Sequence, residues 1–243
     1  TTTVEPARPL SVAAPTEEDA LVLRRIAQLL AGTRPPRRMT YEEFLDWADE
    51  DTLAEWVDGE VVMSSPASLE HQDLGDFLVA VLRTFVGRRQ LGKVLSAPFQ
   101  MKLPKSGREP DLLFVAADRT DQFAHAHFKG PADLAVEIIS EESVARDRGD
   151  KFYEYEGAGV SEYWLLDPIR KRAEFYRLGK EDRYRLVEPA ADGVFRSEVV
   201  PGFWLRVEWL WQDPLPSELD VLAEIVGLGA DWAAEFDRAL SSP

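Results

Sequence analysis

A single glutamate inside an apolar run constrains the fold of this chain more than any other feature. Residues 134–139 are Leu-Ala-Val-Glu-Ile-Ile, so Glu137 has only aliphatic neighbours along the chain. A short, unbroken apolar run of this kind predicts a strand that is buried on both faces of a sheet. An unpaired charge is expensive to bury, so Glu137 needs a partner. An ion pair, a hydrogen-bond network or a metal ion could serve, and we favour a metal ion.

A second carboxylate stands at the start of another apolar segment. Asp111 follows Pro110 and comes directly before residues 112–115, Leu-Leu-Phe-Val, which predict a strand. If this strand and the one at 134–139 are neighbours, Asp111 and Glu137 converge on one point. One or two carboxylates with several waters form the ligand set that Mg²⁺ prefers. A simple cap at the end of the strand is the alternative role for Asp111.

A charged segment after the second strand supplies a lysine. We expect a helix over residues 144–156, and Lys151 lies in it, 14 residues after Glu137. Asp147 precedes Lys151 by four residues, a spacing that places both side chains on one helix face. The pair is therefore either part of the site or a surface ion pair.

The rest of the pattern predicts an α+β fold with a mixed sheet. Thr40 and Glu43 form a capping box at the start of a short helix. Asp58-Gly59 between apolar runs predicts a hairpin over residues 55–63. We expect a long helix from Ser68 to Phe85, strands at 94–101, 112–115, 134–139 and 162–166, and antiparallel additions at 173–178, 184–187 and 195–200. The helix at 144–156 permits a parallel crossover between the last two central strands.

Three parts of the chain are predicted. Residues 1–36 are an extension that is flexible at first and then helical, residues 37–210 are the main domain, and residues 211–243 are a C-terminal helical extension. The helix of that last part is expected within residues 215–240. Trp204, Trp209 and Trp211 precede it and are either core residues or an exposed contact surface.

Composition limits the partners and the compartment. The net charge of −16 argues against a polyanionic partner, but residues 83–108 hold seven basic residues and no acidic one. The chain has no cysteine, which suits a reducing cytoplasm and excludes thiolate chemistry. No apolar run approaches the roughly 20 residues of a membrane span. We expect a cytoplasmic protein without a membrane segment.

An ordered set of short motifs carries a resemblance to a known family. Pro110-Asp111 with Glu137-Ile138-Ile139 resembles the PD-(D/E)XK restriction-endonuclease-like superfamily, as does the order helix, three strands, helix, strand. More narrowly, the chain is similar to the Uma-type family of bacterial restriction-endonuclease-like proteins. The matching phrases are Met39-Thr40-Tyr41-Glu42-Glu43-Phe44, Val57-Asp58-Gly59-Glu60, Ser65-Pro66 with His71, Val136-Glu137-Ile138-Ile139-Ser140, Arg146-Asp147-Arg148-Gly149-Asp150-Lys151-Phe152 and Gly159 to Pro168.

The resemblance implies a metal-dependent DNA endonuclease. Asp111 and Glu137 would hold Mg²⁺ or Mn²⁺, and Lys151 would orient the nucleophile or neutralise developing charge. The superfamily places its lysine two residues after the glutamate, where this chain has Ile139. In the Uma-type branch Lys151 would replace it from the following helix. Glu60 and His71 are secondary candidates, as an outer metal ligand or a hydrogen-bond partner, and His71 is equally compatible with a core position.

Two alternative functions stay open, and the first of them keeps the fold. The resemblance also fits a catalytically inactive module that binds nucleic acid or protein, and the acidic ends of the chain suit such a role. A purely protein-binding protein would instead use the three tryptophans as an exposed patch. Many members of the superfamily act as dimers, so the resemblance implies a homodimer as one arrangement.

Overall fold

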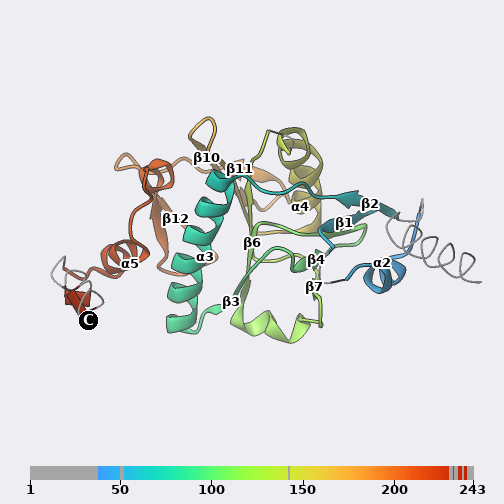
Figure 1. The fold of residues 1–243 in the computed structure, drawn as a ribbon, viewed down its shortest axis with the longest axis horizontal. Helices are drawn as coiled ribbons and strands as arrows, with labels where there is room; N and C mark the ends of the chain where they lie inside the picture. Colours follow the sequence, from blue (N-terminus) through green and yellow to red (C-terminus); the bar gives the residue numbers. More distant parts are fainter. Residues whose placement is uncertain are drawn as a thin grey trace, which may run out of the picture.

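The computed structural model describes residues 38–49, 52–141, 143–229, 232, 235, 236, 238 and 239 (Figure 1). The predicted extension over residues 1–36 lies outside the described residues. The first described helix is α2 (Tyr41–Trp47), and Thr40 and Glu43 form the predicted capping box at its start. None of the helices within the described ranges combines the length and the hydropathy that a membrane span requires.

A six-stranded mixed sheet forms the centre of the molecule. Its strands are β3 (Gly92–Ser96), β6 (Leu112–Ala116), β8 (Leu134–Ile138), β9 (Glu162–Asp167), β10 (Arg172–Leu178) and β11 (Tyr184–Leu186). Their order in the sheet is β11-β10-β9-β8-β6-β3. The pair β8–β9 is parallel and every other neighbouring pair is antiparallel. The prediction of a mixed α+β fold with a parallel crossover at this point is confirmed.

A five-stranded second sheet lies beside the first. It contains β1 (Ala54–Val57), β2 (Glu60–Met63), β4 (Gln100–Lys102), β5 (Ser106–Arg108) and β7 (His127–Lys129). The hairpin β1–β2 turns at Asp58 and Gly59, whose φ angles of 48° and 92° are those that an Asp-Gly hairpin turn requires. The predicted hairpin is therefore confirmed.

The expected strand over residues 94–101 is wrong as a single strand. The chain leaves the central sheet after Ser96 and enters the second sheet at Gln100. Pro98 lies between the two strands and has no backbone N–H to donate to a ladder, which disfavours a continuous strand there. Between β6 and β8 the chain forms the 3₁₀-helix η1 (Ala117–Gln122) and then β7.

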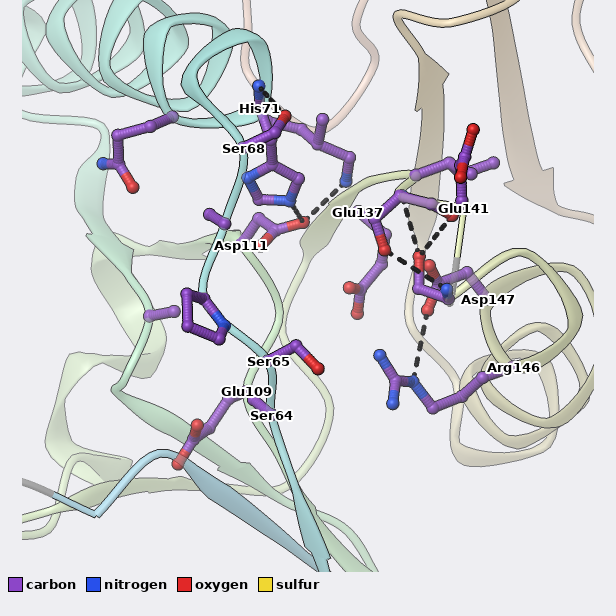
Figure 2. Close-up of a pocket in the computed structure, with 18 of the residues that line it drawn as sticks. Ser64, Ser65, Ser68, His71, Glu109, Asp111, Glu137, Glu141, Arg146 and Asp147 are labelled. Atoms are coloured by element: carbon purple, nitrogen blue, oxygen red, sulfur yellow. Dashed lines mark hydrogen bonds and ion pairs between the residues drawn. The ribbon is translucent and has the colours of Figure 1, made fainter.

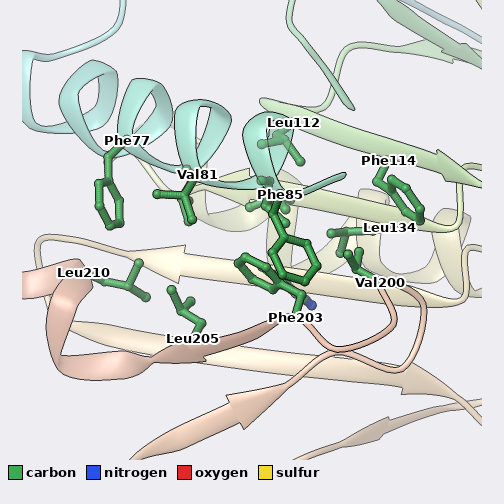
Figure 3. Close-up of a cluster of buried hydrophobic side chains, with 14 of the residues drawn as sticks. Phe77, Val81, Phe85, Leu112, Phe114, Leu134, Val200, Phe203, Leu205 and Leu210 are labelled. Carbon is green, nitrogen blue, oxygen red and sulfur yellow. The ribbon is translucent and has the colours of Figure 1, made fainter. Parts of the chain in front are cut away.

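Helices cover both faces of the central sheet (Figure 1). The side chains of β6 and β8 alternate between two cores, which explains why every residue of β8 is buried. The long helix α3 (Leu69–Arg89) packs on one face, and Figure 3 shows Phe77, Val81 and Phe85 directed into that core. The short helix α4 (Phe152–Ala158) packs Tyr155 into the core on the other face.

The segment before α4 is a π-helical turn, η2 (Arg146–Lys151), rather than a regular α-helix. Together η2 and α4 occupy the range in which a helix was expected. Gly159 ends α4 with a φ angle of 94°, as a C-terminal glycine does. Short π-helical segments are rare in proteins, but those that occur are often found at functional sites.

The C-terminal part adds β12 (Val194–Arg196), β13 (Trp204–Arg206), the 3₁₀-helix η3 (Val207–Trp211) and α5 (Glu218–Val226). Trp209 is buried, and Trp204 and Trp211 are partly buried against the core beneath α3. The interpretation of the three tryptophans as an exposed patch is therefore wrong. The helix expected over residues 215–240 is interrupted, because Gly227 adopts a φ angle of 75° and ends α5.

Two glycines give a matched test of this packing. A Cβ atom on Gly92 would lie 2.0 Å from the Val115 carbonyl oxygen, whereas one on Gly87 in α3 would meet nothing within 4 Å. We expect Gly92→Ala to lower the free energy of unfolding by about 1–3 kcal/mol. Gly87→Ala should raise it by about 0.5–1 kcal/mol, since alanine is the better helix former. Urea unfolding followed by tryptophan fluorescence measures both, and equal midpoints for the two variants would contradict the described β3–β6 contact.

Candidate active site

The structure brings Asp111 and Glu137 together. Strands β6 and β8 are antiparallel neighbours with Leu112 opposite Val136, so the next pair in register is Asp111 and Glu137. Asp111 Oδ2 accepts a hydrogen bond of 2.6 Å from the Ile138 backbone N–H. Both carboxylates line the same cleft (Figure 2).

Glu137 is a fully engaged buried carboxylate. It is 3% exposed, and Oε1 accepts a hydrogen bond of 2.7 Å from the Tyr155 hydroxyl. Lys151 Nζ donates to Oε2 at 2.8 Å. Burial raises the pKa of Glu137 well above its ordinary value, and the ammonium group of Lys151 opposes that rise.

Lys151 extends from the π-helical turn into a set of three carboxylates. Its Nζ lies 2.8 Å from Glu137 Oε2, 3.1 Å from Glu55 Oε1 and 3.7 Å from Asp147 Oδ1. Burial lowers the pKa of Lys151, but these carboxylates outweigh burial and hold it above its ordinary value. The lysine is therefore charged. The alternative of an Asp147–Lys151 surface ion pair is wrong, because Asp147 is 1% and Lys151 3% exposed.

The second sheet contributes a buried ion pair behind the lysine. Glu55 Oε2 on β1 lies 3.0 Å from Arg108 Nη1 on β5, and Arg108 Nη2 lies 2.7 Å from Glu154 Oε2. Glu55 Oε1 also accepts a 3.0 Å hydrogen bond from the Glu109 backbone N–H. Burial alone would raise the pKa of Glu55, but Lys151 and Arg108 lower it below its ordinary value. Glu55 thus remains ionised between two cations.

The two secondary candidates have different places. His71 lies in the first turn of α3, lines the cleft, and holds Nε2 3.4 Å from Asp111 Oδ2. The contact with Asp111 raises the pKa of His71. Glu60 is exposed on β2 and lies 3.9 Å from Arg38 Nη2, on a strand end that does not line the cleft. The structure therefore groups His71 with the central carboxylates and leaves Glu60 apart.

The cleft has a volume of about 960 Å³ and an excess of acidic groups in its lining. The basic side chains that line it are Arg146, Lys151 and His71. The acidic ones are Glu55, Glu70, Glu109, Asp111, Glu137, Glu141 and Asp147. Burial, then the neighbouring charge of Glu55, raises the pKa of Glu109 to about 7.

The sequence comparison identifies the family of the chain. Residues 41–208 match the model of the Uma2 family, described as "Putative restriction endonuclease". The chain belongs to the Uma2 family. The resemblance drawn from the short motifs is thereby confirmed. No match was found for this Uma2 chain among curated proteins.

A solved structure supports the fold of this Uma2 chain. It is the crystal structure of a "putative nuclease belonging to DUF820" from Anabaena variabilis, with a TM-score of 0.61. The match covers 71% of this chain and 97% of that chain at 17% sequence identity. At this identity the likeness is one of fold, and it confirms the predicted restriction-endonuclease-like core.

The donor set of the Uma2 site fits a hard divalent cation. Among the residues that the structure describes, no group of three or more His, Cys, Asp or Glu side chains is arranged to hold a metal ion. Mg²⁺, however, is commonly held by one or two carboxylates with several waters, and Asp111 and Glu137 supply two. Asp147 Oδ1 is buried without a hydrogen-bond partner, and burial raises the pKa of Asp147. A cation would relieve the repulsion among these crowded carboxylates.

Sequence reasoning missed Glu55, Arg108 and Tyr155. Glu55 had the same signal as Glu137, an acidic residue inside a predicted strand, but in a shorter and more polar run. Arg108 is one of the seven basic residues in 83–108, a pattern that does not distinguish it from the exposed ones, whereas it is 3% exposed. Tyr155 gave no signal, because an aromatic residue in a predicted helix indicates a core position first.

Proposed function

We propose that this Uma2 protein is a metal-dependent nuclease that hydrolyses phosphodiester bonds of DNA in the acidic cleft. One observation carries the proposal: two carboxylates from neighbouring strands face one cleft, and a buried ammonium group lies 2.8 Å from one of them. The family description supports nucleic acid as the substrate class. The catalytic unit is proposed to span residues 37–210, close to the matched residues 41–208.

In this proposal Asp111 and Glu137 hold Mg²⁺ or Mn²⁺. A divalent ion bound there lowers the pKa of a coordinated water and polarises a phosphoryl oxygen. Lys151 and the Tyr155 hydroxyl fix the orientation of the Glu137 carboxylate by donating to its two oxygens. The charge of Lys151 also opposes the negative charge that develops on the phosphate during attack by water. His71 orients Asp111 from the first turn of α3.

Glu55 and Arg108 would act one step further from the reaction. Glu55 keeps Lys151 charged and aimed at Glu137, and Arg108 keeps Glu55 ionised. The site therefore combines side chains from both sheets and from η2. A single site cuts one strand, so double-strand cleavage would require two copies, and a homodimer is part of the proposal for that product.

A specific observation favours a second candidate function. Both Glu137 oxygens already accept hydrogen bonds, from Tyr155 and Lys151, which also suits an inactive module that binds DNA through this fold. Such a module would bind DNA without changing it. The two candidates therefore differ in a product that is simple to measure.

Supercoiled plasmid incubated with the intact protein tests the proposal. We expect conversion to the nicked form with about 5 mM Mg²⁺ or Mn²⁺, a concentration that fills a weak site for an oxygen-bound ion. With excess chelator we expect no nicked product. Linear product would indicate paired sites. Plasmid that stays supercoiled with both metals, while still shifting on a gel with the protein, would exclude the nuclease and favour the binding module.

A further inference from the structure

Arg146 at the start of η2 carries a guanidinium group whose two terminal nitrogens have no ion-pair or hydrogen-bond partner among the described residues. Its side chain is 34% exposed, and Nε lies 3.8 Å from Asp147 Oδ1. Both of these atoms are buried and neither makes a hydrogen bond. Within the described ranges, that contact is the one ion pair of Arg146. In Figure 2 the terminal nitrogens of Arg146 point away from Asp147 into the cleft that Ser64 and Ser65 also line.

The other arginines that are buried or partly buried behave differently. Each has a terminal or Nε nitrogen within 3.1 Å of a carboxylate oxygen. These arginines are Arg108, Arg119, Arg148, Arg177 and Arg206. Their side chains are explained by structural ion pairs. The position of Arg146 is not explained in that way, although it lies only two residues from Arg148.

The charges that line the cleft single out Arg146 for an anion. Lys151 is occupied by Glu137 and Glu55, and His71 faces Asp111. Arg146 is therefore the basic side chain of the lining with donors to spare. An acidic cleft admits a phosphate only where a cation offsets the carboxylates, and an arginine fork matches two phosphate oxygens at once.

We propose that Arg146 binds a phosphate group of the DNA backbone beside Asp111 and Glu137. The inference rests on the proposed function for its ligand, but it concerns binding rather than hydrolysis. Asp147 restrains the Nε edge of the guanidinium, and the two terminal nitrogens donate to non-bridging phosphate oxygens. Arg146 is thus a substrate-binding residue, and its short distance in sequence from Lys151 keeps both cations on one helical turn.

Binding measured without turnover tests this role. A fluorescent DNA duplex is titrated with the intact protein, Arg146→Met, Arg146→Lys and Arg88→Met, with Ca²⁺ in place of Mg²⁺, at several salt concentrations. Arg88 is an exposed arginine in the last turn of α3 and does not line the cleft. Arg88→Met is therefore the matched control, because it removes one positive charge away from the cleft. A denaturing gel after each titration verifies that the strands are intact, and circular dichroism verifies the fold.

We expect Arg146→Met to weaken binding about tenfold or more, the scale of a charge-assisted hydrogen-bond pair. The slope of log K against log salt should fall by about 0.9, the value of one lost phosphate contact. Arg146→Lys should retain the slope but bind more weakly than the intact protein, and Arg88→Met should match the intact protein.

The outcomes separate this inference from the proposed function. Equal affinities and slopes for Arg146→Met and the intact protein, or equal losses for Arg146→Met and Arg88→Met, would overturn the role of Arg146 and leave plasmid cleavage untouched. Arg146-dependent binding by a protein that cleaves no plasmid would support this inference and overturn the nuclease. No DNA binding by the intact protein would overturn both.

Discussion

Lys151→Met is expected to destabilise the protein strongly and to abolish plasmid cleavage. The change removes an ammonium group that lies 2.8 Å from Glu137 and 3.1 Å from Glu55, all three being at most 3% exposed. Removing one partner of a buried ion pair leaves an uncompensated charge, which lowers the free energy of unfolding by about 3–5 kcal/mol. Methionine matches the length of the lysine stem, so the effect reports charge rather than volume. Urea unfolding measures the stability and the plasmid assay measures the activity.

A double variant separates the two effects. Glu137→Gln combined with Lys151→Met removes both charges, and Glu55 remains paired with Arg108. The effects of mutations in one network are not additive. The double variant should therefore lose less free energy of unfolding than the sum of the losses of the two single variants. It should regain most of the lost stability without regaining cleavage. A Lys151→Met protein as stable as the intact one would show that this pairing contributes nothing to the fold.

Asp111→Asn is expected to lower plasmid cleavage by more than about 100-fold while the fold persists. Mutations of groups that only support metal ligands already reduce affinity or activity about 10–100-fold, so loss of a ligand charge should exceed that range. The asparagine oxygen can still accept the hydrogen bond from the Ile138 N–H, so the β6–β8 contact should survive. The matched control is Asp150→Asn, an exposed position in η2, which should cleave like the intact protein.

The same pair of variants tests the metal site without any turnover. Mn²⁺ at 100 times its dissociation constant should stabilise the intact protein by about 2.7 kcal/mol, because it binds the folded state. Asp150→Asn should gain the same stability, and Asp111→Asn should gain little or none. An equal Mn²⁺-dependent rise in melting temperature for both variants would exclude Asp111 as a ligand.

The sequence was informative where the chemistry was local. Glu137 could be singled out because an acid inside an aliphatic run violates the pattern of a buried strand. Asp111 could be expected near Glu137 as soon as the two strands were taken to be neighbours in the sheet. The hairpin turn is specified by its own two residues, Asp58 and Gly59.

The parts that escaped prediction depend on contacts between distant segments. Arg108 has the sequence environment of a surface arginine, and only the approach of β1 and α4 encloses it between Glu55 and Glu154. The π-helical turn has no local signature in the sequence, and the contacts of its Lys151 are with Glu55 and Glu137, which come from distant segments. Glu60 is the converse case: its motif suggested a role, but the strand end that carries it lies outside the cleft.

Lys151 on η2 contacts Glu55 on β1 of the second sheet and Glu137 on β8 of the central sheet, so its ammonium group links the two sheets. Because the ammonium group is held from both sides, separation of the β1–β2 hairpin from the rest would release it into solvent and undo the arrangement around Glu137. The arrangement around Glu137 is thus tied to the docking of the two sheets against each other. Backbone amide exchange at the hairpin should therefore report the fraction of molecules in which the two sheets are docked.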